Sequence, residues 1–265
     1  QSFLERKQLP HLLFYGSPGT GKTSAILALA HQLYGASKSA GMVLELNASD
    51  DRGINVVREE IMTFASSQGF FSSTHKLIIL DEADSMTKDA QNSLRRVIES
   101  YTNNVRFCII CNYQTKIIPA IQSRCMKFRF GPLESEHISK RLCKILKSEN
   151  CPYNEQGINA AVHLGNGDMR KTINIVESCF FSFGKVHEEN VYLNCGKPTT
   201  KTVEAVLQLL LNADMADAFQ EIISLKKSEG LALSDLVTSI FDVIHKYEIE
   251  QGRMAHLVQY LAELE

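Results

Sequence analysis

The sequence lacks several features that would assign the chain to a particular class. It has no apolar run near the roughly 18 residues that a membrane-spanning helix needs, so we predict no membrane span. The chain begins at Gln1 without a charged and then apolar leader, and we expect no secretory signal and a trimmed start. Internal repeats and low-complexity tracts are also missing. The 265 residues therefore predict about two globular domains.

Cysteine is present, but not with the spacing of a disulfide framework or a zinc site. Of the seven cysteines, Cys108 and Cys111 form a C-x-x-C pair. The pair lies in the apolar run "RFCIIC", which predicts a buried strand whose side chains three positions apart point to opposite faces. Since no second C-x-x-C completes a zinc site, we interpret the cysteines as reduced, buried thiols of a cytosolic or nuclear protein.

A strong net charge is also missing, but the charge is unevenly distributed. Residues 1–150 carry 19 Lys and Arg against 14 Asp and Glu, whereas residues 151–265 carry 9 against 16. The mildly basic first half is compatible with a phosphate-bearing partner without requiring one.

Short apolar runs alternate with helical patterns over residues 1–131, which is typical of a parallel sheet covered by helices. Strands are predicted at residues 11–15, 42–46, 76–80, 106–111 and 127–130. From residue 135 onward only helical patterns follow, and "GKP" at 196–198 is a plausible boundary. We therefore predict an α/β domain at 1–131, a helical domain at 132–197 and a second helical domain at 198–265.

The stretch "GSPGTGKT" fits the phosphate-loop pattern G-x-x-x-x-G-K-[ST] between a predicted strand and a predicted helix. Glycines let the backbone curl so that its N–H groups face phosphate oxygens, and the helix N-terminus adds a positive dipole. Lys22 is predicted to reach the β- and γ-phosphates and Thr23 to ligate Mg²⁺. The predicted nucleotide-binding residues are Gly16, Ser17, Pro18, Gly19, Thr20, Gly21, Lys22, Thr23 and Ser24.

A matching acidic pair ends the predicted strand in "LIILDEAD" at residues 77–84. Asp81 is predicted to hold the Mg²⁺ of the phosphate-loop site. Glu82 is predicted to polarise the attacking water. By themselves two adjacent carboxylates could be a solvated turn, but a phosphate loop upstream favours a nucleoside triphosphatase.

Three further polar residues have both a functional and a structural interpretation. Asn112 ends the predicted strand "RFCIIC" and could orient water or the γ-phosphate, or could simply favour a turn. Arg170 lies in a first helical turn, where the dipole disfavours a cation, so it is either placed for an anion or is a surface residue. Arg124 in "IQSRCMKFRF" is either a solvated turn charge or a contact for an anion.

These motifs together identify a resemblance. The ordered set "GSPGTGKT", "LELNASDDRGI", "LIILDEAD", "AQNSLRRVIE", "FCIICN", "QSRCMKFRF" and "NGDMRK" resembles that of AAA+ clamp-loader subunits, in particular the small subunits of eukaryotic replication factor C. The resemblance is dense over residues 9–200 and looser beyond. It implies an ATP-binding α/β domain, a helical lid and a helical collar that joins five subunits. It also implies that the assembly opens a sliding clamp (PCNA) and loads it onto primer–template DNA in the nucleus.

The resemblance also implies roles for individual residues. Asn112 matches the sensor-1 position and Arg170 the sensor-2 position, whereas Arg124 matches the arginine finger that acts on ATP held by the neighbouring subunit. The positions that it implies for contacts with DNA phosphates are Arg52, Arg58 and Lys116, which residue type alone would assign to solvated surface.

The sequence differs from the family pattern at two places, and two alternative functions stay open. The stretch that wraps the adenine base in the family precedes the start of this chain, and we expect the collar to be incomplete at Glu265. One alternative is a structural subunit that binds ATP and supplies Arg124 to a neighbour with little hydrolysis of its own. The other is a different AAA+ DNA-remodelling ATPase, such as a branch-migration motor.

Overall fold

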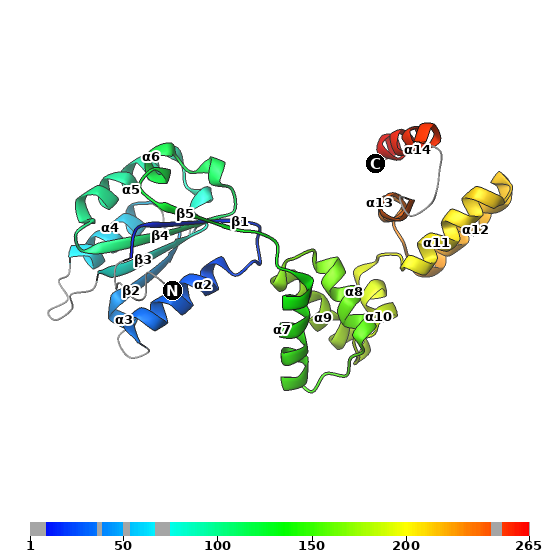
Figure 1. Cartoon of the computed structure of the whole chain (residues 1–265), viewed down its shortest axis with the longest axis horizontal. Helices are drawn as coiled ribbons and strands as arrows, with labels where there is room; N and C mark the ends of the chain where they lie inside the picture. The colour runs from blue at the N-terminus through cyan, green and yellow to red at the C-terminus, as the bar shows by residue number, and fades with distance from the viewer. Residues whose placement is uncertain (1–8, 36–38, 50–53, 67–74, 245–250, 265) are drawn as a thin grey trace. The chain divides into compact units, whose positions relative to one another are not determined.

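The computed structural model describes residues 9–35, 39–49, 54–66, 75–244 and 251–264. The chain divides into two compact units, Gln1–Leu133 and Glu134–Glu265, called unit 1 and unit 2 below. Figure 1 shows strands with covering helices in unit 1, and helices in unit 2. The change of pattern near residue 132 therefore coincides with the division between the two units.

Unit 1 is built on a parallel sheet whose five described strands follow the order β2-β3-β4-β1-β5 (Figure 1). Each predicted strand is confirmed, with ends that differ by at most one residue. The strands are β1 (Leu12–Gly16), β2 (Val43–Asn47), β3 (Lys76–Asp81), β4 (Val105–Cys111) and β5 (Met126–Phe130). β3 and β4 are almost wholly buried, which explains why their sequences are continuous apolar runs.

Helices cover both faces of this sheet and form two apolar cores. Ile78 and Phe107 point into one core with α4 and α5, and Phe14 and Ile110 point into the other with α2. Cys111 belongs to the first core and Cys108 to the second, as the alternation of strand side chains predicts. The helical elements are α2 (Lys22–Tyr34), α3 (Ser39–Met42), α4 (Ile54–Ser66), α5 (Lys88–Tyr101) and α6 (Pro119–Gln122), with 3₁₀ turns η1 (Ala83–Ser85) and η2 (Gln114–Lys116).

The strand order determines which loops meet. β4 lies between β3 and β1, and all three run parallel, so their carboxyl ends lie side by side at one edge of the sheet. Ligands of open α/β sheets bind at this edge, where the order of strands departs from sequence order. The residues that follow β1, β3 and β4 are the phosphate loop, Glu82 and Asn112.

The regular elements in the described residues of unit 2 are helices, as predicted, and one isolated β-bridge joins Tyr153 and Val186. The helices are α7 (Ser135–Ser148), α8 (Glu155–Gly165), α9 (Met169–Phe183), α10 (Glu188–Cys195), α11 (Thr200–Asn212), α12 (Met215–Glu229), α13 (Leu233–Ile244) and α14 (Gln251–Leu264). α8, α9 and α10 pack against one another, and α11 packs against α12 and α13. The predicted division at residue 198 stays a prediction. Across the described parts of both units, no helix combines the length and hydrophobicity needed to cross a bilayer.

Candidate nucleotide-binding site

The loop after β1 needs its glycines for two separate reasons. A Cβ on Gly16 would lie 1.9 Å from the carbonyl oxygen of Phe130, so only glycine allows the two backbones to approach. Gly19 and Gly21 have φ angles of 65° and 88°, in the left-handed region that glycine tolerates. Gly21 is also the N-cap residue of α2, so the loop delivers the chain directly to a helix N-terminus. The local sequence therefore creates the curled backbone of a phosphate-binding loop.

Lys22 lies inside this loop. Its side chain is buried, and its Nζ donates hydrogen bonds to the carbonyl oxygens of Gly16 at 2.9 Å and Ser17 at 2.8 Å. The Thr20 hydroxyl donates to the same Ser17 carbonyl at 2.9 Å. These hydrogen bonds close the loop around the Lys22 ammonium group at the N-terminus of α2.

Asn112 reaches the same ammonium from the end of β4. Its Oδ1 accepts a hydrogen bond from Lys22 Nζ at 3.0 Å, although the two residues are 90 positions apart in sequence. The strand order explains this contact, since β4 pairs directly with β1. The structure thus brings together the phosphate loop and the polar residue that the sequence analysis singled out after the fourth strand.

Thr23 and Asp81 are in direct contact. The Thr23 hydroxyl donates to Asp81 Oδ2 at 2.6 Å, and Asp81 Oδ1 accepts from the Glu82 N–H at 2.8 Å. A hydroxyl and a carboxylate oxygen are hard oxygen ligands of the kind that Mg²⁺ prefers beside substrate phosphates. The residues present therefore fit a magnesium ion held between the phosphate loop and the end of β3.

Glu82 has an unusual backbone conformation. Its φ of 54° places a non-glycine residue in the left-handed region, where steric strain costs of order 1–3 kcal/mol. The conformation is held by the following turn, because the Glu82 carbonyl accepts from both the N–H and the hydroxyl of Ser85. The side chain is exposed to solvent. Strain of this kind clusters at functional sites, which agrees with the predicted role of Glu82.

Asp84 supports the site in a way that the sequence analysis missed. Its Oδ2 accepts the backbone N–H groups of Asn112 and Tyr113, both at 3.2 Å. The carboxylate therefore fixes the turn that carries Asn112. Its position in "LIILDEAD" was visible, but its partners follow 28 and 29 residues later, so no local signal identified them.

Gln91 is a second residue that the sequence analysis missed. It is 1% exposed, and its Nε2 donates to the carbonyls of Met86 and Lys116 while its Oε1 accepts from the Ile118 N–H at 2.8 Å. This side chain ties α5 to the segment between η2 and α6. No spacing in the sequence connects Gln91 to Lys116 and Ile118, which follow 25 and 27 residues later.

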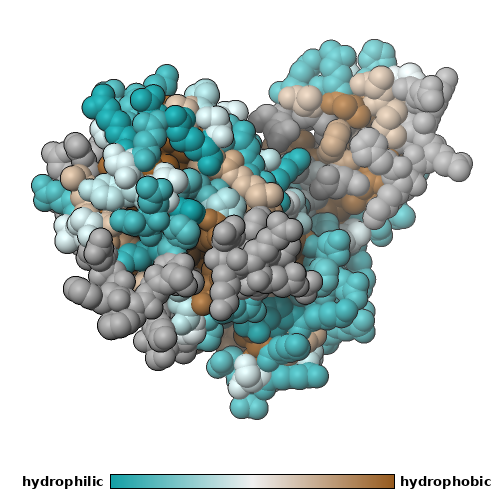
Figure 2. Space-filling view, turned by 60° about the vertical axis from the view of Figure 1, so that its left-hand side comes forward, coloured by the Kyte–Doolittle hydropathy of each residue, from teal (hydrophilic) through white to brown (hydrophobic). Residues whose placement is uncertain are grey.

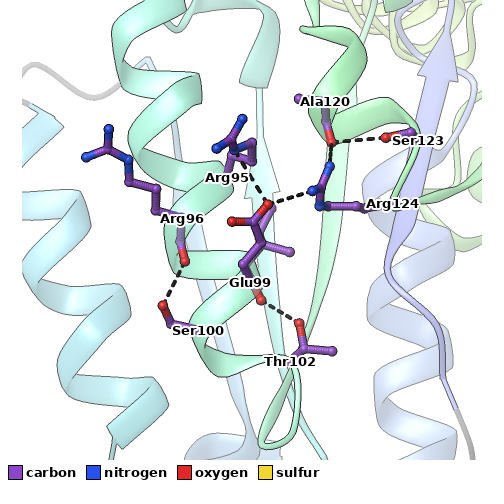
Figure 3. A network of polar contacts seen from close by, with 9 residues as sticks. Arg95, Arg96, Glu99, Ser100, Thr102, Ala120, Ser123 and Arg124 are labelled. Carbon is purple, nitrogen blue, oxygen red and sulfur yellow. Dashed lines mark hydrogen bonds and ion pairs between the residues drawn. The ribbon is translucent and has the colours of Figure 1, made fainter.

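Arg124 follows α6 and contacts its own unit. One guanidinium nitrogen donates to the Ala120 carbonyl at 2.6 Å, and the other pairs with Glu99 Oε1 at 2.6 Å (Figure 3). Among the described residues, its hydrogen bonds and ion pairs involve these two partners and none from the phosphate loop. The geometry favours neither cis contact with the site of this chain nor a purely solvated charge.

The remaining predicted residues lie apart from this cluster or outside the described set. Arg170 is exposed in the first turn of α9 in unit 2, so its relation to the phosphate loop stays a prediction. Arg52 lies outside the described residues, as does the side chain of Arg58 in α4. Lys116 ends η2, with its Nζ 5.2 Å from the centre of the Tyr113 ring.

Two family descriptions match this chain. The ATPase family associated with various cellular activities (AAA) matches residues 12–133, and the replication factor C C-terminal domain matches residues 198–265. Replication factor C subunit 5 of Mus musculus and that of Homo sapiens are each 50% identical over 265 residues, covering 100% of this chain and 78% of theirs. Replication factor C subunit 3 of Saccharomyces cerevisiae is 46% identical over 271 residues, covering 100% and 79%. The chain belongs to the replication factor C family.

This membership confirms the resemblance seen in the motifs, and the similar subunits are those numbered five in mouse and human and three in budding yeast. The chain is a homologue of these clamp-loader ATPase subunits and a member of the nucleotide-binding AAA family. Two solved structures of Thermotoga maritima RuvB, one of them titled a Holliday junction branch migration motor, align with TM-scores of 0.57 and 0.56 over 97% of this chain and 90% of theirs. At 12% and 13% identity they show the AAA+ fold alone.

Proposed function

We propose that this chain is an ATP-hydrolysing subunit of a replication factor C assembly that opens a sliding clamp and loads it onto primer–template DNA in replication and repair. The observation that carries the hydrolytic part of this proposal is the paired contact at the carboxyl edge of the sheet. Thr23 bonds to Asp81 while Lys22 bonds to Asn112, so residues from three strands converge on one loop. A subunit that does not bind ATP would not need this convergence. A structural subunit that binds ATP would need it, so the test below changes Glu82, the residue proposed to act only in hydrolysis.

The residues of the loop divide the work of holding ATP and Mg²⁺. Backbone N–H groups of the loop, from residues 16–24 other than Pro18, and the N-terminus of α2 offer donors for phosphate oxygens. Lys22 provides a positive charge at the same place, and Thr23 and Asp81 provide oxygen ligands for the metal. When bound, the metal neutralises charge on the phosphates. Glu82 accepts the proton of the attacking water, and the Asn112 amide orients that water or the γ-phosphate.

Other residues are proposed to act between subunits or on DNA. Arg124 serves the ATP of a neighbouring subunit, since its described contacts keep it outside the site of its own chain. Arg170 contacts nucleotide from the lid. Arg52, Arg58 and Lys116 contact backbone phosphates, which gives preference for duplex shape rather than for sequence.

The C-terminal helices are proposed to form the collar of a hetero-pentamer. They carry exposed apolar side chains, and Figure 2 shows hydrophobic residues gathered over this part of the chain. The exposed apolar side chains of these helices include Leu210, Leu211, Met215, Phe219 and Leu233. Exposed apolar side chains gathered on neighbouring helices are typical of contact sites between proteins. The same proposal places the assembly, with PCNA as its clamp, in the nucleus.

The test is ATP turnover by the complex reconstituted with its native partners, with Glu82→Gln in this chain alone. Loss of a general base typically lowers turnover at its own site by about 10² to 10⁴. We therefore expect the ATP turnover stimulated by clamp and primed DNA to fall by the fraction that this one site contributes to the turnover of the whole complex. The matched control is Glu136→Gln, which changes an exposed glutamate of α7.

Two outcomes would contradict the proposal in different ways. Unchanged stimulated turnover with Glu82→Gln would indicate a structural subunit that hydrolyses little ATP. Stimulation by DNA alone, with no response to the clamp, would indicate another AAA+ remodelling ATPase.

A further inference from the structure

The guanidinium of Arg124 is held in a defined orientation by two acceptors. The Ala120 carbonyl takes one N–H at 2.6 Å, and Glu99 Oε1 takes another at 2.6 Å (Figure 3). The first acceptor belongs to α6, which precedes Arg124, and the second belongs to α5. Glu99 thus connects the turn that carries Arg124 to a helix whose buried stripe packs on the sheet.

Glu99 is itself placed by its own helix. Arg95 lies one turn earlier on α5, with its Nε 3.5 Å from the same Glu99 Oε1. Two arginines therefore flank one carboxylate, and the group keeps an excess positive charge (Figure 3). An arriving phosphate would still be attracted to this cluster although Glu99 is already paired.

The two acceptors occupy only part of the donor capacity of Arg124. A guanidinium has five N–H donors in a rigid plane, so three stay available after the bonds to Ala120 and Glu99. Arg124 and Glu99 are 39% and 40% exposed, and an ion pair with this exposure adds little to folding stability. The contact is therefore better suited to orienting the guanidinium than to holding the fold together.

We propose that Glu99 is a positioning residue that orients the Arg124 guanidinium for the ATP of the neighbouring subunit. This inference rests on the proposed function of Arg124 as a finger in trans. Glu99 does not touch the nucleotide. It fixes the plane of the guanidinium, so that the unused N–H groups are already oriented when the neighbour's γ-phosphate develops charge. Such preorganisation lowers the barrier to the chemical step without strengthening binding of the ground state.

The experiment is a double-mutant cycle in the reconstituted complex, with Glu99→Ala, Arg124→Ala and the double variant. Pre-steady-state ATP hydrolysis with clamp and primed DNA separates the slowed site as its own phase. We expect Arg124→Ala to slow the neighbour's site by about 10³ or more. We expect Glu99→Ala to lower kcat there about tenfold, with little change in KM, and to have no further effect once Arg124 is removed.

Two further variants separate positioning from a merely structural role. Glu99→Gln keeps an oxygen acceptor at the same place and should restore most of the lost rate, which a loss of helix stability would not explain. Glu136→Ala removes another exposed glutamate paired at i and i+4, with Lys140, and should leave the rate unchanged. The thermal midpoint of the complex should be the same for Glu99→Ala and Glu136→Ala.

The outcomes distinguish this inference from the proposal beneath it. Normal turnover with Arg124→Ala would overturn the finger assignment and this inference together. A slowed Arg124→Ala combined with an unaffected Glu99→Ala would overturn the role of Glu99 alone. Equal losses from Glu99→Ala in the presence and absence of Arg124 would overturn it as well, because the two residues would then act independently.

Discussion

The two units of this chain differ in how they use buried polar side chains. Five of the six buried polar or charged residues among those described lie in unit 1, and one lies in unit 2. In unit 1, Gln91 donates a hydrogen bond to the carbonyl of Lys116, 25 residues later, and Lys22 donates one to Asn112, 90 residues later. In unit 2, the hydroxyl of Thr172 bonds to the Asp168 carbonyl one helical turn away. The six residues are His11, Thr20, Lys22, Lys76, Gln91 and Thr172.

The difference shows how each unit depends on tertiary structure. Unit 1 uses most of its buried polar groups to join segments that are distant in sequence, and we call these contacts the polar joints of unit 1. Lys22 forms such a joint in the candidate site, whereas His11 and Lys76 form them at the amino-terminal ends of β1 and β3. Unit 2 satisfies its polar groups locally and packs apolar helix faces. A buried polar group that loses its partner costs about 1–3 kcal/mol. Substitutions at such joints should therefore affect unit 1 more strongly than any comparable change affects unit 2.

The largest expected effect on stability is at Gln91. Gln91→Leu leaves two carbonyls and the Ile118 N–H without their partner inside unit 1. We expect a loss of about 3 kcal/mol in the free energy of unfolding, from more than one unsatisfied group. Hydrogen exchange resolved by segment should show faster opening of β3 and β4, with α7–α10 unchanged. The control is Asn92→Ala, the exposed neighbour on the same helix. Equal protection in Gln91→Leu and the wild type would contradict this prediction.

The next effect is a loss of unit 1 stability in acid. Burial, with Arg106 and His75 nearby, lowers the pKa of His11 from 6.5 to about 4. Its Nδ1 accepts the Phe107 N–H at 3.1 Å, which also requires the neutral ring. The unfolded chain therefore binds the proton first. Stability falls as the pH drops from 6.5 towards 4, by at most about 3 kcal/mol.

Hydrogen exchange of β1 and β4 at pH 7 and pH 5 measures this effect. In His11→Gln the difference between the two pH values should shrink, whereas His163→Gln, at an exposed position of α8, should leave it unchanged. The burial of His75 and the charge of Arg106 also lower the pKa of His75, so a smaller slope in the same direction should persist without His11. An unchanged slope in His11→Gln would rule out His11 as the source.

The smallest effect should be equal in both units. Asn154 caps α8 by accepting the Gly157 N–H, and Thr87 caps α5 by accepting the Ala90 N–H. Each substitution to alanine should cost about 1 kcal/mol in the unit that contains it, because both caps are local. Chemical denaturation followed by segment-resolved hydrogen exchange measures the two losses. A much larger loss for Thr87→Ala would mean that even local contacts in unit 1 are coupled to its polar joints.

Much of the fold and part of the site could be predicted from the sequence. The five strands were predicted to within one residue, because β3 and β4 are continuous apolar runs and the others are bounded by turn residues. The N-cap of α5 is Thr87, a residue type that favours this position in any sequence. The roles of Asp84, Glu99 and Gln91 were not predicted, since each depends on partners at least 25 residues away.

The sequence by itself determined the curled loop at residues 16–23, the succession of strands and helices along the chain, and the family. These features depend on conformational preferences and spacing within a few residues, which the chain carries wherever it is placed. Only the tertiary structure decided that Asn112 reaches Lys22, that Asp84 holds the turn of Asn112, and that Glu99 holds Arg124. Those contacts follow from which strands and helices pack side by side, and packing is a property of the whole unit rather than of any one segment.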